Sequence, residues 1–429
     1  MTAATDAVLA GLDDATCDEL TALYRDLHRH PELSFQEERT AGVAAERLRA
    51  AGFEVRTGVG GTGVVGVLRN GDGPAVVLRA DMDGLPVAEA TGLPYASTAT
   101  TQDAEGRRVP LMHACGHDMH VTCLAGAAAA LAAGRERWRG TLVAVFQPAE
   151  EVAGGARAMV DDGLLDLVGR PDVVLGQHVF PRPAGTVLVS PGEVMAAADS
   201  LEIRLYGRGG HGSQPEHTVD PVVLAAATVM RLQTVVSREV SPFDRAVLTV
   251  AQIHAGHKEN VIADEASITV NLRSFSPEVR RRLLDGVERV VRAEAAASGA
   301  PRPPELRTLN SFPLTVNDPG ATAVVREAFS ARFGAERVTD LAPLMGSEDF
   351  GVFGAEAGAP SVFWGLGCAD PETYERAVRE DRLAEDVPGN HSPAFAPVLS
   401  PTLRMGTEAL VTAALAWLAP GPGLDPPRG

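Results

Sequence analysis

Cysteine is scarce in this chain. Its 429 residues include four cysteines, scattered along the sequence without a CxxC pair: Cys17, Cys115, Cys123 and Cys368. This spacing excludes the dense disulfide scaffold of a small secreted domain. We expect four reduced thiols, three of them acting as small buried apolar residues. Only Cys115 lies among other residues that can bind a metal ion.

Basic residues are outnumbered by acidic ones. The chain has 38 Lys and Arg residues against 56 Asp and Glu residues, which gives a formal net charge of −18, and no basic run stands out. Such a surface repels phosphate backbones. We therefore expect no nucleic-acid partner.

Long apolar runs are missing as well. The first residues, MTAATDAVLAGLDDATCDE, lack the basic start and apolar stretch of a secretory signal. The smoothest apolar stretch, residues 121–134, is shorter than the roughly 20 residues that a membrane-spanning helix needs. We expect no membrane partner and, by default, a cytoplasmic location. No internal repeat with a period of 20 to 50 residues is evident.

What is present is the composition of a large globular protein. Hydrophobic residues make up 45% and charged residues 22% of the chain, and the length favours two domains. Residues 17–53 predict two helices that are broken at Pro31, with Gly52 as a stop signal. His28 and His30 lie there. Imidazole binds metals, but we interpret these two as a polar helix end that packs locally.

From Pro74 onward, short apolar runs alternate with helical segments. The segments PAVVLRADMDGLP, GTLVAVFQPAEE, PDVVLGQHVF and APSVFWGLG each predict a strand. This alternation is typical of βαβ units, so we predict an α/β fold with a mainly parallel sheet. Ligands of such sheets bind beyond the carboxyl ends of the strands. The first three strands are predicted to end in ionisable side chains: Asp81 and Asp83, Glu150 and Glu151, and His178.

The predicted order of strands and helices changes between about residues 188 and 313. The order there is strand, helix, strand, strand, helix, strand, which is the βαββαβ order of a ferredoxin-like α+β domain. Its second helix has Ser276 at the N-cap position and Pro277 at the first turn. We predict an independent domain at 188–313, inserted between residues 1–187 and 314–429 of a larger domain. The last residues, about 419–429, are predicted to be a disordered tail.

The segment LMHACGHDMH, residues 111–120, carries the clearest chemical signal. Cys115 and His117 are one glycine apart, so their side chains can converge in a tight turn, and thiolate and imidazole are transition-metal ligands. Alone, the segment could be a helix start with accidental histidines. The additional Glu150, Glu151, His178 and His391 favour a metal site.

Seven motifs in order resemble one family of enzymes: RADMDGLP, HACGHD, PAEE, GQH, GRGGHGSQP, GSEDF and NHSPAF. The chain is similar to the co-catalytic metalloamidohydrolases, which include hippurate hydrolases, N-acyl-L-amino-acid amidohydrolases and hydrolases of auxin (IAA) amino acid conjugates. The resemblance runs from HRHPELSFQEE to NHSPAF. It implies a zinc-peptidase-like catalytic domain, cleavage of N-acyl-L-amino acids, and an inserted domain that forms a lid and the contact of a homodimer.

The resemblance also implies roles for single residues. Two divalent metal ions would be held by Cys115, His117, Glu151, His178 and His391. Glu150 would be the general base, and Cys115 would bridge the ions. Asp83 would steady the site, His211 would reach the active site of a partner subunit, and Asn260 and Arg273 would hold the substrate near its carboxylate.

The chemistry has its own physical logic. Two divalent ions roughly 3.5 to 4 Å apart can polarise a carbonyl and bring the pKa of a shared water towards about 7. Glu150 can then move a proton from the water to the leaving amine, and His211 can donate to the oxyanion. The guanidinium of Arg273 can clasp a carboxylate. Alternatively, Arg273 is a surface residue paired with an acid and His211 is a turn residue.

Several points stay open. Thiolate and imidazole favour zinc, whereas relatives of this type point to manganese, with cobalt or nickel also possible. We interpret His113 and His120 as packing or supporting groups and Asp118 as a hydrogen-bonding support. Glu348 and Asp349 resemble a motif but receive no chemical step.

Two rival functions remain at this stage. One is a cysteine amidase with Cys115 as nucleophile, which leaves Glu150, Glu151, His178 and His391 without roles. The other is a metal storage protein, in which a proton carrier such as Glu150 has no purpose.

Overall fold

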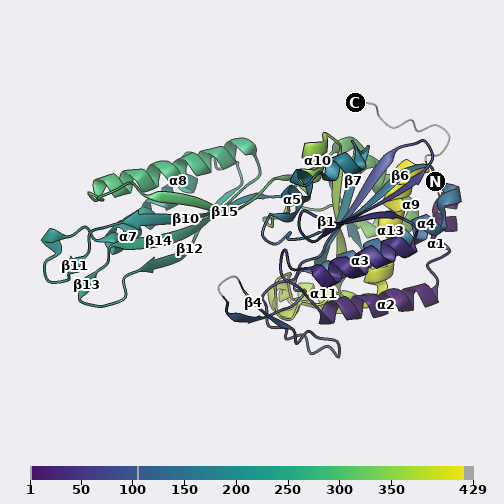
Figure 1. Ribbon diagram of the computed structural model, residues 1–429, viewed down its shortest axis with the longest axis horizontal. Coiled ribbons are helices and arrows are strands. Elements are labelled where there is room, and N and C mark those ends of the chain that lie inside the picture. Colours follow the sequence, from purple (N-terminus) through teal and green to yellow (C-terminus); the bar gives the residue numbers. More distant parts are fainter. Residues whose placement is uncertain (1, 104–105, 420–429) are drawn as a thin grey trace. The chain divides into compact units, whose positions relative to one another are not determined.

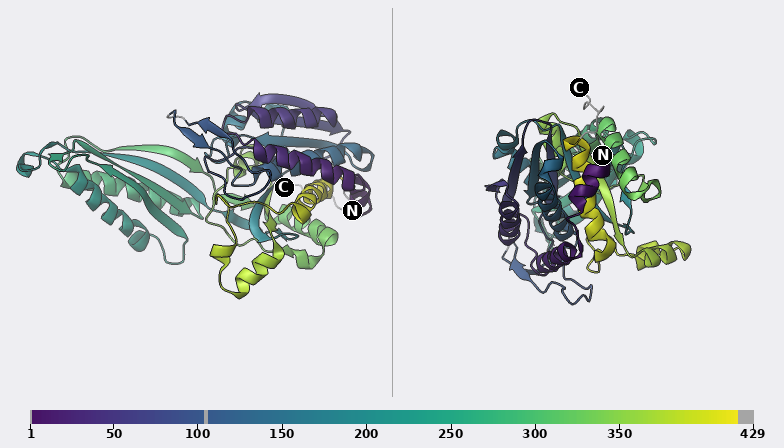
Figure 2. Two further views of the ribbon diagram at one scale, coloured as in Figure 1. Left: turned by 90° about the horizontal axis from the view of Figure 1, so that it is seen from below. Right: turned by 90° about the vertical axis from the view of Figure 1, so that its right-hand side faces the viewer.

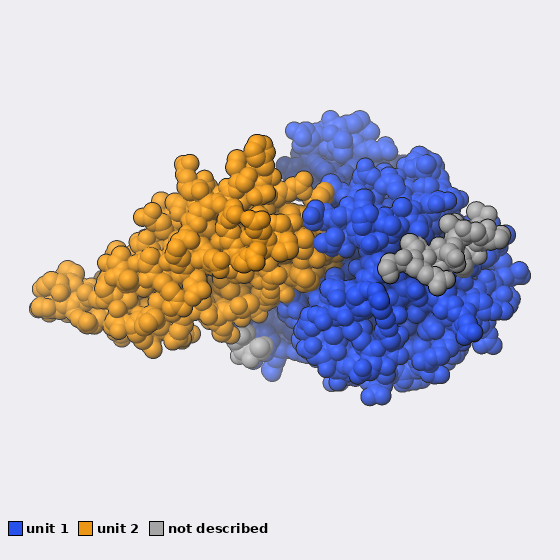
Figure 3. Space-filling model, turned by 90° about the horizontal axis from the view of Figure 1, so that it is seen from above, with its two compact units in different colours: residues 1–194, 316–342, 349–429 blue, residues 195–315, 343–348 orange. Residues whose placement is uncertain are grey.

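The computed structural model of this protein describes residues 2–103 and 106–419. It divides into two compact units, which Figure 3 colours separately. The first unit takes in residues up to 194, residues 316–342 and residues from 349 on, and the second comprises residues 195–315 and 343–348. Most of the predicted disordered tail, residues 420–429, lies outside the described residues.

An eight-stranded sheet forms the centre of the first unit. In spatial order its strands are β1 (Glu54–Val59), β2 (Gly63–Asn70), β6 (Gly140–Gln147), β3 (Ala75–Asp81), β7 (Val173–Pro183), β18 (Ser361–Ala369), β8 (Val187–Leu188) and β17 (Val338–Thr339). The four central strands β6, β3, β7 and β18 run parallel to one another. The predicted α/β fold with a mainly parallel central sheet is therefore confirmed.

The central strands are buried on both faces. In β3, Val76 and Leu78 face a core shared with the long helices, whereas Val77 faces the other side with Leu164 and Phe353. Strands covered by helices on both faces consist of continuous apolar runs. This is why PAVVLRAD shows no alternation of polar and apolar residues.

Helices cover both faces of this sheet, as the end-on view in Figure 2 shows. One layer contains α2 (Asp14–Arg29), α3 (Glu38–Ala50), α4 (His117–Ala133) and α13 (Leu399–Leu418), and the other contains α5 (Gly155–Asp161), α6 (Leu164–Val168) and α10 (Gly351–Ala357). The first unit also contains the α-helices α1 (Thr2–Leu9), α9 (Pro319–Phe333), α11 (Pro371–Arg379) and α12 (Leu383–Asp386). Short strand pairs are β4 (Thr100–Gln102) with β5 (Arg108–Pro110), and β9 (Gly192–Met195) with β16 (Thr315–Asn317).

The helix α4 carries the metal-binding segment at its first turn. Gly116 precedes it with a φ of 82°, and a Cβ added there would lie 2.4 Å from Val179 Cγ2. Only glycine fits this turn. The body of the helix is rich in alanine and buried along nearly its whole length. Cys115 and His117 are thus attached to the centre of the core.

The second unit is a four-stranded antiparallel sheet with two helices (Figure 1). Along the chain it contains β10 (Ala197–Tyr206), α7 (Pro221–Thr234), β12 (Ala246–Ala255), β14 (Glu265–Ser274), α8 (Pro277–Ala297) and β15 (Glu305–Phe312). The sheet order is β12-β14-β10-β15, so β12 and β15 are its edges. A further small pair, β11 (Gly210–His211) and β13 (Val261–Ile262), also belongs to this unit.

Candidate metal centre

The acidic residues gather at the carboxyl ends of two neighbouring parallel strands. β3 ends at Asp81, and Asp83 follows it, while the chain leaves β6 after Gln147 and turns into Glu150 and Glu151. Because parallel neighbours end at the same edge of a sheet, these carboxylates lie close together. Asp83 Oδ1 and Oδ2 accept hydrogen bonds from the backbone N–H groups of Glu150 and Glu151, each at 3.1 Å.

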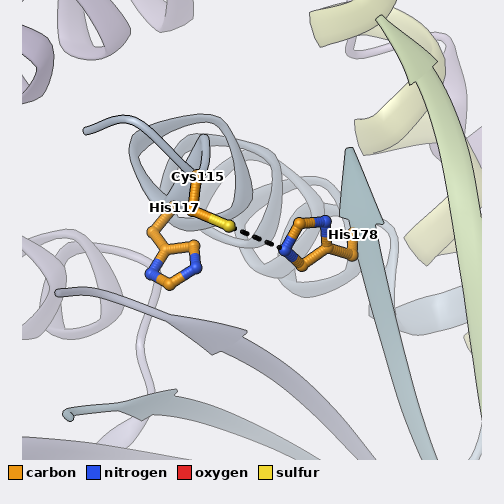
Figure 4. A group of neighbouring side chains, drawn as sticks. All are labelled: Cys115, His117 and His178. Atoms are coloured by element: carbon orange, nitrogen blue, oxygen red, sulfur yellow. Dashed lines mark hydrogen bonds between the residues drawn. The ribbon is translucent and has the colours of Figure 1, made fainter. Parts of the chain in front are cut away.

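Cys115 and His178 face each other across this edge, as Figure 4 shows. The Sγ of Cys115 lies 3.3 Å from Nε2 of His178. We predicted from the sequence that His178 lies at a strand end. It lies instead in the middle of β7. Its Nδ1 donates to the carbonyl of Val179 at 2.8 Å, which fixes the tautomer and leaves the Nε2 lone pair pointing towards the thiol.

His117 is surrounded by carboxylates. Its Nδ1 lies 3.3 Å from Asp83 Oδ1, and its Nε2 lies 3.8 Å from Glu151 Oε1 and 4.0 Å from Glu150 Oε2. Burial lowers the pKa of His117, but Asp81 and Asp83 outweigh it and raise the pKa to about 10. The pocket therefore holds an excess of negative charge, which favours a cation.

His391 closes the cluster from a distant part of the chain. Its Nε2 lies 3.3 Å from Glu151 Oε1, and its backbone N–H donates to the carbonyl of Ala114 at 2.7 Å. The side chain of the preceding Asn390 donates to the carbonyls of Cys115, at 3.3 Å, and Val179, at 3.2 Å. These bonds fix the loop that brings His391 to the Cys115 turn.

The donor set fits a metal centre. One ligand atom each from Cys115, Glu151 and His391 lies within 4.8 Å of the others, and the same holds for Cys115, His117 and His178. Among the described residues, His117 Nε2 and Glu151 Oε1 are buried without a hydrogen-bond partner. Buried polar atoms in proteins are nearly always partnered, and sulfur, imidazole nitrogen and carboxylate oxygen together are typical ligands of transition-metal dications.

The pKa shifts of the proposed ligands bear on such an ion. His117, whose pKa is raised to about 10, would have to lose its proton to bind it. Burial, Glu151 and Glu150 raise the pKa of the Cys115 thiol well above its ordinary value, so a nearby cation is needed to stabilise the thiolate. Burial and the neighbouring His120 lower the pKa of His178 far below its ordinary value. The neutral ring is the form that binds metals.

Comparison with known proteins agrees with this arrangement. The model of the peptidase family M20/M25/M40 matches residues 77–386. The chain belongs to this family. It is 38% identical to a hippurate hydrolase of Campylobacter jejuni over 78% of this chain and 85% of that one. It is 36% identical to an N-acetyl-L-cysteine deacetylase of Bacillus subtilis over 85% of this chain and 84% of that one.

A solved structure shares the fold. A Bacillus subtilis protein described as a dinuclear metal-binding peptidase of family M20 superposes with a TM-score of 0.73 and is 30% identical, covering 94% of this chain and 99% of that one. Membership of the M20/M25/M40 family places this chain among hydrolases of amide bonds. The predicted resemblance to the metalloamidohydrolases is thus confirmed at the level of the family.

Two further residues near the cluster, His120 and Asp81, form hydrogen bonds and ion pairs with other protein groups. The Nδ1 of His120 hydrogen-bonds to Asp81 Oδ1 at 2.5 Å, and its Nε2 accepts the Val179 N–H at 2.9 Å. Asp81 also binds the buried Arg79 at 2.6 Å. Because both nitrogens of His120 are engaged, this histidine supports the site and is not available as a ligand.

His28 contradicts our prediction from the sequence. It does not pack locally: it is buried, with Nδ1 2.6 Å from Asp118 Oδ2 and Nε2 3.1 Å from Glu89 Oε1. Burial lowers the pKa of His28, but the bonds to Asp118 and Glu89 raise it to about 10. His30 is exposed and bonds to the carbonyl of Asp26. Asp118 is hydrogen-bonded, as predicted, and its side-chain partners are His28 and the Met119 N–H.

His113 and Asp349 act in packing and structure. Both ring nitrogens of His113 are buried without a partner among the described residues, and burial lowers its pKa to about 4. Asp349 accepts bonds from Gln147 Nε2 at 2.7 Å and from Ala156 N at 3.1 Å, and lies 3.3 Å from Arg79 Nη2. Glu348 belongs to the second unit, where its carbonyl accepts a bond from Thr315.

The three remaining predicted residues of this M20 protein all lie in the second unit. His211 is exposed in β11, and its Nδ1 binds the Ser213 hydroxyl at 2.7 Å. Asn260 is next to it, since its carbonyl accepts the Gly212 N–H at 2.9 Å. Arg273 lies near the far end of β14, where Nε donates to Asn271 Oδ1 at 2.9 Å.

Proposed function

We propose that this chain is a metal-dependent amidohydrolase that cleaves the amide bond of N-acyl-L-amino acids. The observation that carries the proposal is the convergence of Cys115, His117, Glu151, His178 and His391 next to one additional carboxylate, Glu150. The relatives named above act, by their names, on hippurate and N-acetyl-L-cysteine, which are both N-acyl amino acids.

Cys115, His117, Glu151, His178 and His391 would hold two divalent ions, zinc or manganese, with Cys115 between them. When bound, such ions polarise an amide carbonyl and make water a stronger acid. Cys115 belongs to two groups of close ligand atoms, one with His117 and His178 and one with Glu151 and His391. That position supports its role as the bridging ligand.

Glu150 is the proton carrier of the proposed reaction. It is buried, and its Oε2 lies 4.0 Å from His117 Nε2, at the border of the ligand cluster. It would accept a proton from the attacking water and return it to the leaving amine. Asp83 would keep Glu150 in place through the backbone, because the same carboxylate binds the N–H groups of both glutamates.

Arg273 would bind the substrate carboxylate. Its Nε is used by Asn271, and its Nη1 contacts the carbonyl of Met345 and, at 3.5 Å, the Ser347 hydroxyl. Among the described residues none bonds to Nη2, so the outer edge of the guanidinium is open to a carboxylate. Its observed partners are neutral, which differs from the alternative of a surface arginine paired with an acid.

The geometry of the second unit supports a homodimer. Asn260 and His211 lie beyond the start of β14 at Glu265, whereas Arg273 lies near its end. Eight residues of strand span roughly 26 Å, which is longer than a small N-acyl amino acid. One chain therefore cannot bring Asn260 and Arg273 to the same substrate, so His211 and Asn260 would come from a partner subunit.

The partner would pair through the outer edge of the second unit. β12 is an edge strand, and large apolar side chains are exposed on α7 and β12: Val222, Val223, Met230 and Ile253. Open strand edges and exposed apolar patches both favour association. A two-fold contact between copies of this edge would cover both, and the second unit would act as the lid.

The cysteine amidase is the weaker alternative. A nucleophilic cysteine needs a lowered pKa, whereas burial and two carboxylates raise that of Cys115. For Cys115→Ser we expect weakened metal binding at otherwise normal folding. Full metal content together with full activity in this variant would show that the thiol is not a ligand.

The proposal is tested by stripping the full-length protein with a chelator and reloading it with Zn²⁺ or Mn²⁺. Each form is then assayed on N-acetyl, N-benzoyl and longer N-acyl amino acids. We expect two ions per chain and hydrolysis that disappears on stripping and returns on reloading. Activity that survives complete stripping would favour the cysteine amidase, and a loaded protein that cleaves none of the substrates would favour metal storage.

A further inference from the structure

The turn after β6 contains three consecutive backbone N–H groups that donate hydrogen bonds to buried carboxylates. Asp83 accepts the N–H groups of Glu150 and Glu151. The third N–H, that of Ala149, donates to Oε1 of Glu37 at 2.8 Å. The family motifs imply a role for Asp83 but none for Glu37, although Glu37 belongs to the segment HRHPELSFQEE.

Glu37 is rigidly held where α3 begins. Its carboxylate is buried, and Oε1 accepts a second bond from Phe35 N at 3.0 Å, while Oε2 accepts from the Thr62 hydroxyl. The same segment supports Asp83, because the Ser34 hydroxyl donates to Asp83 Oδ2 at 2.7 Å. Residues 34–37 thus contact the turn in two ways. The carboxylate of Glu37 binds it directly, and Ser34 supports Asp83, whose carboxylate also binds it.

The turn needs such support because its backbone is unfavourable. Ala149 has a φ of 50° and Ala153 a φ of 57°, both in the left-handed region that residues other than glycine rarely adopt. Such conformations persist only where surrounding contacts impose them. The orientation of the Ala149 peptide sets the direction in which the next residue, Glu150, projects.

We propose that Glu37 is a positioning residue, which fixes the turn of Glu150 and Glu151 through the Ala149 amide. Its carboxylate bonds to Phe35, Thr62 and Ala149, and none of these is a proposed ligand. The proposal rests on the proposed function, in which Glu150 carries the proton. What matters is an acceptor oxygen at the correct reach, so the length of the side chain is more important than its charge.

Two variants separate reach from charge. Glu37→Asp keeps the charge but is one methylene shorter, so it cannot bind Ala149 and Thr62 together. Glu37→Gln keeps the reach, since its Oε1 can accept both N–H groups and its Nε2 can donate to Thr62. For Glu37→Asp with saturating metal, we expect kcat to fall about 10- to 100-fold with KM nearly unchanged. For Glu37→Gln, we expect kcat to recover to within a few-fold of the wild type.

Thr40→Val is the matched control. Thr40 lies in the first turn of α3, three residues after Glu37, is equally buried, and its hydroxyl also bonds to a glutamate, Glu32 Oε2 at 2.9 Å. It has no bond to the turn. We expect Thr40→Val to lower the melting temperature but not kcat. A normal kcat in Glu37→Asp, or a loss in Glu37→Gln as large as in Glu37→Asp, would overturn the proposal.

A measurement without catalysis keeps the test decisive if Glu37→Asp does not fold. Amide hydrogen exchange should be slow at Ala149 in the wild type and in Glu37→Gln, and faster in any folded Glu37→Asp. Rapid exchange at Ala149 in the wild type would disprove the proposed bond between Glu37 and the Ala149 amide. Exchange does not depend on turnover. A protein that cleaves no N-acyl amino acid would therefore contradict the proposed function, while the exchange rate at Ala149 would still decide the role of Glu37.

Discussion

Glu150 and Glu151 are chemically identical neighbours with different surroundings. Glu151 Oε1 is buried without a hydrogen-bond partner among the described residues and lies 3.3 Å from His391, whereas Oε2 of Glu150 lies 4.0 Å from Nε2 of His117. Neighbouring side chains of a continuous strand point to opposite faces of the sheet. Here the chain has left β6, and the turn sets the direction of each glutamate separately. One can act as a ligand while the other carries a proton.

This division predicts the effect of Glu150→Gln. The variant keeps the shape of the side chain but cannot accept a proton, so we expect kcat to fall by roughly 10²- to 10⁴-fold. Metal content, measured by elemental analysis, should stay at the wild-type value. Unchanged hydrolysis in this variant would remove Glu150 from the mechanism.

The buried His28 predicts a pH-dependent stability. Its pKa is raised from the ordinary value of 6.5 to about 10 in the folded chain, so the stabilisation is complete below about pH 6.5 and is lost as the pH rises towards 10. His28→Gln leaves Asp118 and Glu89 without their cation and should cost about 3–5 kcal/mol near pH 6. Denaturant unfolding of both proteins from pH 6 to 10 measures this. A constant difference over that range would contradict the assignment.

At the scale of single residues, sequence motifs predicted a set of ligands because cysteine, histidine and carboxylate are rare together. The five ligand positions meet as the resemblance implies, although their role stays a prediction. Glu37 and the partners of His28 were missed for a physical reason. Their bonds join residues 61 to 112 positions apart, and local patterns contain no signal for such contacts.

Among the elements, α8 follows its sequence signals closely. It starts at Pro277, and the N-cap Ser276 accepts the Val279 N–H at 3.1 Å. The predicted cap is therefore confirmed. Replacing Ser276 by alanine removes this bond, and we expect a loss of about 1 kcal/mol in unfolding free energy with no change in the metal content. A stability equal to that of the wild type would show that the cap is dispensable.

The strands were predictable to different degrees. β3, β6, β7 and β18 were found from their apolar runs because all four are buried on both faces. Their ends were less certain. β7 continues to Pro183, beyond His178, because β18 pairs with it from Val174 to Phe180 and again at Pro183, which lies opposite Ala369. Pairing with a distant strand, and not the local sequence, decided where the strand stops.

For the whole molecule, the second unit is where the proposed dimer can be tested. Val223 on α7 is 63% exposed. A charge at the centre of an apolar contact is costly, so Val223→Asp should give monomers in light scattering and lose most of the activity while both metal ions stay bound. The same substitution at Val378, which is 54% exposed on α11, is the control.

The outcomes of that experiment are distinct. A fully active monomer would exclude a catalytic role of His211 from a partner subunit. A dimer that survives Val223→Asp would move the contact to another surface. The dimer, the lid and the cytoplasmic location stay predictions, and within residues 2–103 and 106–419 no helix is long and apolar enough to span a membrane.

The unequal exposure of the proposed ligands has a kinetic consequence. Four of them lie buried or nearly so, but the imidazole of His391 is 55% exposed on a loop with a left-handed backbone. Ions would enter and leave past this side chain, since the others are attached to the core. The two ions would thus exchange with solvent at different rates, and the one bound by His391 would be lost first when metal is scarce.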